Sequence, residues 1–234
     1  MERIDKILSV GAGMSRSDAR RAIKKGRVSV KGNVIREIGF KVSENENIYL
    51  DSMKIDYKKY DYIIMNKPKG VLSASEDKNA RTVIDILPDN LKRRGLFPVG
   101  RLDKDTTGLL IITDDGNFAH KVLAPDKKVY KTYIACLDRE VTEDVLKDFV
   151  SGMTLADGTE LAPAKIKIAG ERTAEVSITE GKYHQIKRMF GKYHIAVVEL
   201  KRISFAGLDL PVDLNEGEAR RLNDIEIDSL IKKY

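Results

Sequence analysis

The sequence contains a single cysteine, Cys136, no tryptophan, and few aromatic residues of any kind, which make up 6% of its 234 positions. One cysteine cannot form an intramolecular disulfide or supply a thiolate-rich zinc site, and its isolation suits a reducing compartment. The longest apolar runs, such as LLII at 109–112, fall far short of the ~20 residues that a transmembrane helix needs. The N-terminal segment MERIDKILSVGAG lacks the apolar stretch of a signal peptide. We therefore expect a soluble cytoplasmic protein with no membrane partner.

The composition is that of a globular chain with a core. Hydrophobic residues make up 42% and charged residues 33%, which excludes collagen, a coiled coil and wholesale disorder. The length fits one large domain or two modest ones. The formal net charge of +6 favours a polyanionic partner.

This charge is concentrated in two places. Residues 1–47 hold eleven Lys and Arg against six Asp and Glu, so they carry +5 of the total. Residues 182–202 form a second basic segment, in which Glu199 is the single acid. The rest of the chain is close to neutral, so we expect two separate basic surfaces.

The first basic segment has a compact local pattern. Ile4, Ile7 and Leu8 have helical spacing, and Ser15 followed by Asp18 is typical of a helix start. Gly26 ends the second helix, and a hairpin follows with its turn at Gly32-Asn33. One face of the second helix carries cations spaced three or four residues apart, and with so few aromatic residues nearby it favours contact with RNA phosphates. The candidate RNA-binding residues there are Arg16, Arg20, Lys24 and Arg27.

The segment RIDKILSVGAGMSRSDARRAIKKGRVSVKG resembles a small RNA-binding module that is shared by a ribosomal protein of the small subunit, tyrosyl-tRNA synthetases and several RNA-modifying enzymes. Gly11 and Gly13 do not form a dinucleotide-binding loop, because Arg16 stands where the third glycine belongs and no strand precedes them. We assign residues 1–47 to this module, residues 48–60 to a linker and residues 61–234 to a second, catalytic domain.

The second domain mixes strands and helices without regular alternation. We expect strands at 62–67, 109–113, 131–137, 164–169 and 174–179, with a further short strand after Gly70. We expect helices near 82–88, 117–123, 142–151, 184–192 and 224–233. This pattern favours an α+β fold with a mixed, mostly antiparallel sheet over a doubly wound parallel sheet.

The segment FPVGRLDKDTTGLLIITDDG at 97–116 allows three interpretations. It is compatible with a polar turn that leads into a core strand. The spacing of Asp103, Asp105 and Asp114 loosely follows a calcium loop, but Pro98 and the run LLII argue against that site. In the third interpretation Asp103 is a catalytic carboxylate at a loop tip, and Arg101 beside it contacts nucleic acid.

Resemblance favours the third interpretation. GRLDKDTTGLL (100–110) resembles the signature of pseudouridine synthases, in the branch that includes the small-subunit (16S) rRNA pseudouridine synthase A. Further blocks follow the order of that family: NKPKGVLSA (66–74), TVIDILP (82–88), KTY (131–133) and EGKYHQIKRMF (180–190). The likeness extends over essentially the whole chain.

The resemblance implies the following site. Asp103 is the essential aspartate, Tyr133 is the active-site tyrosine, and Lys187 is the basic residue that pairs with the aspartate, where sister branches often have arginine. Arg101 fills the gap left by a flipped nucleotide. The remaining candidate RNA-binding residues are Lys67, Lys69, His184, Gln185 and Arg188.

The reaction implied is the isomerisation of a specific uridine to pseudouridine in 16S rRNA, with no cofactor. Its first step stays open between attack of Asp103 on the base, attack on the sugar, and a glycal route. His120, His184 and His194 are too widely spaced to predict a metal site. We expect a monomer whose partner is ribosomal RNA or a partly assembled small subunit. The alternatives are a synthase acting on 23S rRNA and a non-catalytic RNA-binding protein of ribosome assembly.

Overall fold

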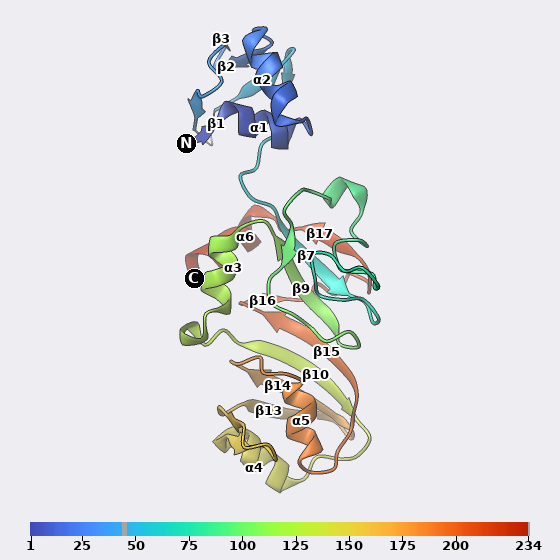
Figure 1. The fold of residues 1–234 in the computed structure, drawn as a ribbon. Helices are drawn as coiled ribbons and strands as arrows, with labels where there is room; N and C mark the ends of the chain where they lie inside the picture. The colour runs from blue at the N-terminus through green and yellow to red at the C-terminus, as the bar shows by residue number, and fades with distance from the viewer. Residues whose placement is uncertain (44–45, 234) are drawn as a thin grey trace. The chain divides into compact units, whose positions relative to one another are not determined.

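The computed structural model describes residues 1–43 and 46–233, which divide into two compact units, Met1–Tyr60 and Asp61–Tyr234 (Figure 1). The division falls directly before residue 61, where the sequence places the start of the catalytic domain. Each unit has its own hydrophobic core.

The N-terminal unit begins with two short helices, α1 (Ile4–Gly11) and α2 (Arg16–Lys24). The Ser15 hydroxyl accepts a hydrogen bond from the Asp18 amide at 3.1 Å, so the predicted helix start is confirmed. A four-stranded sheet follows in the order β3 (Asn33–Ile35), β2 (Val28–Val30), β5 (Ile48–Leu50) and β6 (Met53–Lys54). A separate pair joins β1 (Glu2–Arg3) to β4 (Lys41–Val42).

Two predictions for this unit are wrong. The hairpin turns at Lys31-Gly32 rather than at Gly32-Asn33, because Asn33 pairs with Val30 and already belongs to β3. Both turn residues have positive φ, as the two-residue turns that match strand twist require. The predicted linker 48–60 begins with strands β5 and β6, since Ile48 and Leu50 bury their side chains in the core of this unit.

The second unit is built on a nine-stranded sheet. Its main path runs β13–β14–β10–β15–β9–β7–β17, and the pairing of β15 with β9 is the parallel one, as expected for a mixed, mostly antiparallel sheet. Its strands are β7 (Tyr62–Lys67), β8 (Phe97–Pro98), β9 (Thr107–Thr113), β10 (Lys131–Leu137), β13 (Lys165–Gly170), β14 (Thr173–Ile178), β15 (Val197–Phe205), β16 (Leu208–Asp209) and β17 (Ala219–Arg221). A small separate hairpin joins β11 (Met153–Thr154) to β12 (Glu160–Leu161).

Four of the predicted helices of this unit are confirmed: α3 (Gly116–Leu123), α4 (Glu143–Ser151), α5 (Gln185–Gly191) and α6 (Asp224–Lys233). Short 3-10 turns lie at Asp89–Leu91 and Pro125–Lys127. In Figure 1, α4 and α5 lie at the end of the sheet that holds β13 and β14, and α3 lies at the end that holds β7 and β9.

The helix predicted at 82–88 is wrong, and so is the strand after Gly70. Thr82 and Asp85 start a helical turn, in which the Asp85 carboxylate accepts from the Thr82 amide at 2.8 Å and from its hydroxyl at 2.9 Å. Pro88 then ends the turn before a helix can propagate. The segment after Gly70 makes a single bridge, from Leu72 to Thr82.

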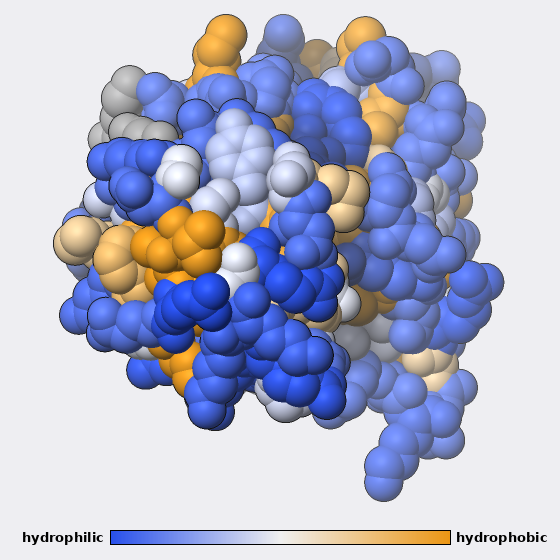
Figure 2. Space-filling view, turned by 90° about the horizontal axis from the view of Figure 1, so that it is seen from above, coloured by the Kyte–Doolittle hydropathy of each residue, from blue (hydrophilic) through white to orange (hydrophobic). Residues whose placement is uncertain are grey.

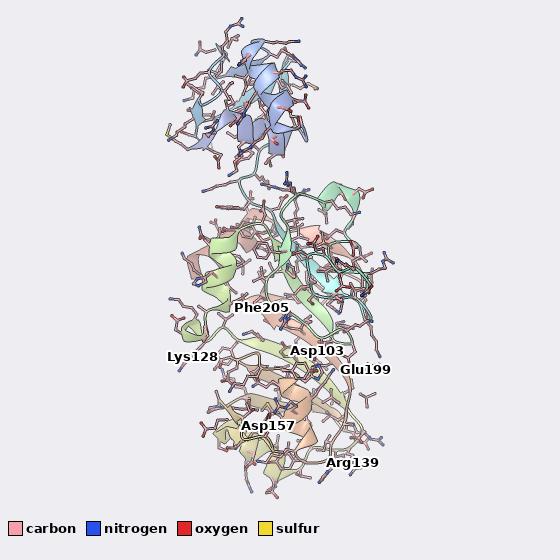
Figure 3. The ribbon with its side chains drawn as sticks, viewed as in Figure 1. Asp103, Lys128, Arg139, Asp157, Glu199 and Phe205 are labelled. Carbon is pink, nitrogen blue, oxygen red and sulfur yellow. The ribbon has the colours of Figure 1, made fainter. Side chains whose placement is uncertain are left out.

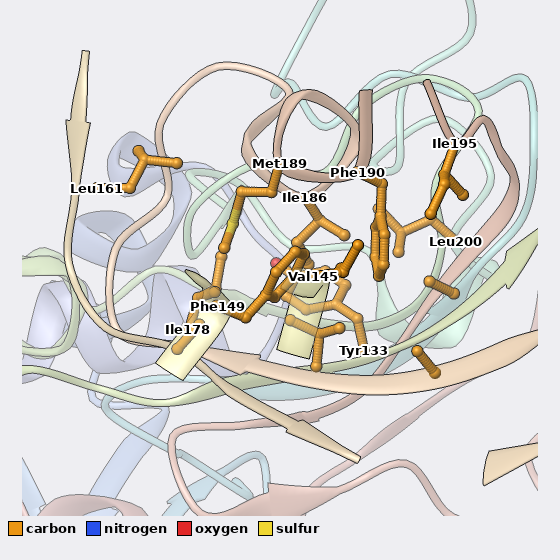
Figure 4. Packing of buried hydrophobic residues seen from close by; sticks show 14 of the residues in the cluster. Tyr133, Val145, Phe149, Leu161, Ile178, Ile186, Met189, Phe190, Ile195 and Leu200 are labelled. Atoms are coloured by element: carbon orange, nitrogen blue, oxygen red, sulfur yellow. The ribbon is translucent and has the colours of Figure 1, made fainter. Parts of the chain in front are cut away.

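The largest apolar cluster fills the space between α4, α5 and the sheet. Phe149 of α4 and Phe190 of α5 pack with ring centroids 4.8 Å apart, and Tyr133 of β10 borders the same cluster (Figure 4). This packing fixes α5 over β10, so it sets the distance between Lys187 and the loop that precedes β9. In the described residues, no helix combines the length and apolarity needed to cross a membrane.

Candidate active site

A cavity of about 800 Å³ opens in the second unit where the 101–106 loop, β10 and the start of α5 meet. The loop joins β8 to β9 and carries Asp103, which Figure 3 labels beside the central strands. Tyr133 lines the cavity from β10, and Ile186 forms part of its wall from α5, as the sequence predicts. Segments that lie far apart in the chain therefore meet around one carboxylate.

Asp103 is surrounded by cationic or ionisable groups that do not hydrogen-bond to it. Lys187 Nζ lies 3.6 Å from Asp103 Oδ2, and His184 Nε2 lies 3.6 Å from Asp103 Oδ1. The predicted pair of Asp103 and Lys187 is thus brought together. The Lys187 ammonium instead donates to both carboxylate oxygens of Asp105, each at 2.7 Å, and this bond holds the pKa of Asp105 below its usual value.

Tyr133 stands at one end of a row of residues that crosses four strands. Tyr133 pairs with Arg202 of β15, Arg202 pairs with Gly108 of β9, and Gly108 pairs with Lys67 of β7. Gly108 is required there because a Cβ would lie 2.2 Å from the Arg202 carbonyl oxygen, and its φ is +101°. The Arg202 Nε donates to the Leu109 carbonyl at 2.7 Å, and complete burial lowers the pKa of its guanidinium.

Lys67 is not an RNA-facing residue, which corrects the sequence prediction. Its side chain is fully buried, and Nζ donates to the carbonyls of Pro68 at 3.0 Å, Lys104 at 3.3 Å and Thr106 at 3.0 Å. Burial lowers its pKa to about 8. Lys67 therefore connects the end of β7 to the loop that carries Asp103, through hydrogen bonds to its backbone carbonyls. Lys69, two residues later, is exposed and borders the cavity.

Ser73 provides a second attachment for the loop. Its hydroxyl donates to the Leu102 carbonyl and accepts from the Leu102 amide, both at 3.1 Å. The Gly70 amide donates to the Lys104 carbonyl at 2.8 Å. These bonds hold the backbone on both sides of Asp103, so the carboxylate projects from a fixed loop rather than from a mobile one.

Gln185 also differs from its predicted RNA-binding role. It is 4% exposed, its side-chain oxygen accepts from the Lys182 amide at 3.0 Å, and its amide nitrogen donates to Glu180 at 3.4 Å. These bonds secure the loop in front of α5 and leave the side chain little capacity for RNA. Arg188 is half-buried and pairs with Asp157.

The other predicted RNA-binding residues are on surfaces. Arg101 is exposed at the cavity, and His184 lines the cavity next to Asp103. In the N-terminal unit Arg16, Arg20, Lys24 and Arg27 are all exposed. Arg20 also donates to Asp5 at 3.2 Å, and Arg27 to Asp51. Their predicted contacts with RNA stay predictions.

Sequence reasoning missed three contributors to this site: Arg202, Ser73 and the role of Asp105 as the anchor of Lys187. Asp105 stands inside the quoted block GRLDKDTTGLL, so its position next to Asp103 was a usable signal. Arg202 carried no such signal, because only the strand register reveals that it lies beside Tyr133.

The arrangement can place a carboxylate against a substrate inside a partly enclosed cavity, with Lys187 and His184 beside it. Asp103 can act as a nucleophile or stabilise positive charge, and Tyr133 can stack on a base or exchange a proton. Among the described residues, no group of three or more His, Cys, Asp or Glu side chains is placed to hold a metal ion.

Comparison with known proteins agrees with this geometry. The sequence profile described as RNA pseudouridylate synthase matches residues 61–192, and that of the S4 domain matches residues 2–48. The chain is 36% identical to the ribosomal large subunit pseudouridine synthase B of Bacillus subtilis (98% of this chain, 96% of that protein). It is 35% identical to the ribosomal small subunit pseudouridine synthase A of Escherichia coli (98% and 100%).

Among solved structures, a crystal structure of a pseudouridylate synthase is 31% identical, with a TM-score of 0.69, over 98% of this chain and 100% of that one. Both profiles fall on the two units that the structure separates, and the relatives match along nearly their whole length. The chain belongs to the RNA pseudouridylate synthase family, and it carries an S4 domain in front of the synthase domain.

Proposed function

We propose that this protein isomerises one specific uridine of 16S ribosomal RNA to pseudouridine and uses Asp103 as its catalytic carboxylate. The observation that carries the proposal is the position of Asp103: it lies in the cavity, 3.6 Å from the Lys187 ammonium, on a loop held at three points. A carboxylate that is held in this way beside a cation is ready to attack without rearrangement of its loop.

The reaction breaks the N-glycosidic bond of uridine, turns the uracil and rejoins it to the ribose through C5. N1 gains a proton and C5 loses one, so no group and no electron is gained or lost, and no cofactor is required. Asp103 forms the transient adduct or stabilises the ribose cation, and Tyr133 packs against the uracil. Lys187 supplies an opposite charge 3.6 Å from the Asp103 carboxylate.

The target uridine must leave its stack to reach Asp103, at a cost of a few kcal/mol. Arg101 is exposed two residues before Asp103 and is placed to occupy the gap in the RNA. The exposed cations of α2 add phosphate contacts that help to offset this cost. The face shown in Figure 2 is mainly hydrophilic, with small separate apolar areas.

The assignment to 16S rRNA follows the resemblance of GKYHQIKRMF to the small-subunit branch. It is supported by the small subunit synthase of E. coli, all of whose length is matched here. A large subunit synthase of B. subtilis is similar to the same degree, so 23S rRNA is the direct competitor. We further propose that the protein acts as a cytoplasmic monomer on free rRNA or on a partly assembled small subunit.

The proposal is tested with uridine-tritiated 16S and 23S transcripts, because isomerisation releases tritium from C5 and simple binding releases none. We expect release from the 16S transcript alone, and loss of release in the Asp103→Asn variant with RNA affinity retained. Release from the 23S transcript alone would transfer the assignment to the large subunit. Binding without release, both from the transcripts and from a partly assembled small subunit with the same label, would instead indicate an RNA-binding protein of ribosome assembly.

A further inference from the structure

The rim of the active-site cavity carries an exposed aromatic ring that the reaction described above does not use. Tyr183 is 75% exposed, although it lines the same cavity as Asp103. One face of its ring is stacked on the His184 imidazole, with centroids 3.8 Å apart and planes 18° from parallel. A ligand that covered the other face of this ring would gain hydrophobic free energy, because apolar area would leave water.

The ring is held in place by its support. His184 has φ +47°, a left-handed conformation that a residue with a side chain adopts only when its surroundings enforce it. The backbone amide of Lys182 donates to the side-chain oxygen of Gln185. The backbone amide of Gln185 donates in return to the Lys182 carbonyl at 3.1 Å. His184 in turn lies 3.6 Å from Asp103. The stacked pair is therefore preorganised at a fixed distance from the catalytic carboxylate.

We propose that Tyr183 is a stacking platform for one RNA base next to the flipped uridine, and that it helps to determine which uridine is modified. This inference rests on the proposed function, because it needs a flipped uridine at Asp103. Bases stack readily on tyrosine rings, and an RNA-modifying enzyme must hold the nucleotides beside the one that it extrudes.

The position of Tyr183 favours a neighbouring base over the target uracil. Tyr133 is 7% exposed and lies within the cavity, where it can cover the uracil that reaches Asp103. Tyr183 is ten times more exposed and lies at the rim, where a base that stays outside the cavity would pass. Lys104 and Arg101 also border the cavity and are exposed, so they can hold the phosphates on either side of such a base.

The test combines protein variants with altered RNA. The substrates are synthetic RNA fragments around the mapped target uridine, each with one flanking nucleotide replaced by an abasic residue. On unmodified RNA, Tyr183→Ala should lower kcat/KM about 5- to 150-fold through KM, because stacking outside the reacting base is equal in the ground and transition states. Tyr183→Phe should retain the wild-type KM, since stacking does not need the hydroxyl.

The decisive result is coupling between the ring and one nucleotide. On the RNA that lacks the stacking base, wild type and Tyr183→Ala should have the same KM, whereas all other abasic substrates should keep the difference. The control is Tyr130→Ala, which removes another exposed tyrosine that lies outside the cavity lining and should leave KM unchanged. If Tyr183→Ala loses the same factor in kcat/KM on every abasic substrate, Tyr183 has a structural role and the proposal is overturned.

The absence of tryptophan allows a direct measurement. Tyr183→Trp introduces a unique fluorophore, whose emission should be quenched by the intact RNA and not by the RNA that lacks the stacking base. Quenching that depends on the target uridine itself would overturn the proposal in favour of stacking on the flipped base. Failure of wild-type protein to release tritium would refute the proposed function, whereas activity without coupling to any flanking base would refute only the role of Tyr183.

Discussion

Removing the buried ammonium with Lys67→Met should make the stability of the synthase domain depend less on pH than it does in the wild type. The lowered pKa of Lys67, about 8 against 10.5 for a free side chain, means that the folded protein loses this proton first. Between these two values the unfolded chain binds more protons, so the free energy of unfolding rises with pH. From pH 7 to 9.5 Lys67 alone contributes a rise of about 2 kcal/mol.

The difference between the two proteins at pH 7 can also be worked from the contacts. Lys67→Met leaves the carbonyls of Pro68 and Thr106 without a donor, which costs about 2 kcal/mol each, or about 4 in total, whereas the Lys104 carbonyl keeps the Gly70 amide as its donor. It also removes the penalty of a buried charge, which the pKa shift sets at about 3 kcal/mol. We therefore expect the variant to be about 1 kcal/mol less stable at pH 7, and about 3 kcal/mol less stable at pH 9.5.

The assay is urea unfolding followed by circular dichroism at pH 7.0, 8.0, 9.0 and 9.5. Lys131, whose pKa burial also lowers to about 8, is present in both proteins, so its contribution cancels in the difference. Lys69→Met is the matched control, because this neighbouring ammonium is exposed, and its effect should stay within about 0.5 kcal/mol. If the difference in unfolding free energy between wild type and Lys67→Met stays constant or narrows from pH 7 to 9.5, Lys67 does not have a lowered pKa in the folded protein.

Three further outcomes are expected. Lys187→Met removes the cation shared by Asp103 and Asp105 and should slow single-turnover tritium release by about 10²-fold, or ~3 kcal/mol, whereas Lys192→Met, on the outer surface, should not. Gly108→Ala should lower the unfolding free energy by more than about 3 kcal/mol, measured by thermal melting, because its Cβ would overlap the backbone of the paired strand. Lys24→Ala should reduce the slope of log RNA affinity against log salt by about 1, whatever the RNA sequence; an unchanged slope would remove α2 from the RNA interface.

The parts of the fold that sequence reasoning predicts are those that local signals determine. Ser15 begins a helix because its own side chain caps it, and the strand at 131–137 alternates half-buried and buried residues from Thr132 onward. The helix predicted at 82–88 fails because the same local signals compete: a capped start at Thr82 is followed within two turns by Pro88. Strands β5 and β6 were missed because their polar neighbours hide a short alternation of Ile48 and Leu50.

The site divides in a similar way. Resemblance places Asp103, Tyr133 and Lys187 together, and the structure brings all three to one region. The sequence does not predict the buried residues that hold this site in place, Lys67 and Arg202. Lysine and arginine side chains are usually exposed, so the sequence predicts exposure for Lys67 and Arg202. Both are buried in the structure, where they lie in one cross-strand row with Gly108. No local pattern encodes the pairing of residues so far apart in the chain.

Asp105 gives this arrangement its chemical use. In the described part of the chain, the Asp103 carboxylate accepts no hydrogen bond, and its nearest cation stops 3.6 Å away because Asp105 holds the Lys187 ammonium at 2.7 Å. The Lys67 ammonium also attracts the carboxylates of Asp103 and Asp105 electrostatically, without a hydrogen bond to either. Asp103 thus receives the field of two cations while both of its oxygens remain open to substrate. A hydrogen bond from the ammonium to Asp103 would have to break before Asp103 could attack, so the longer separation leaves the nucleophile accessible.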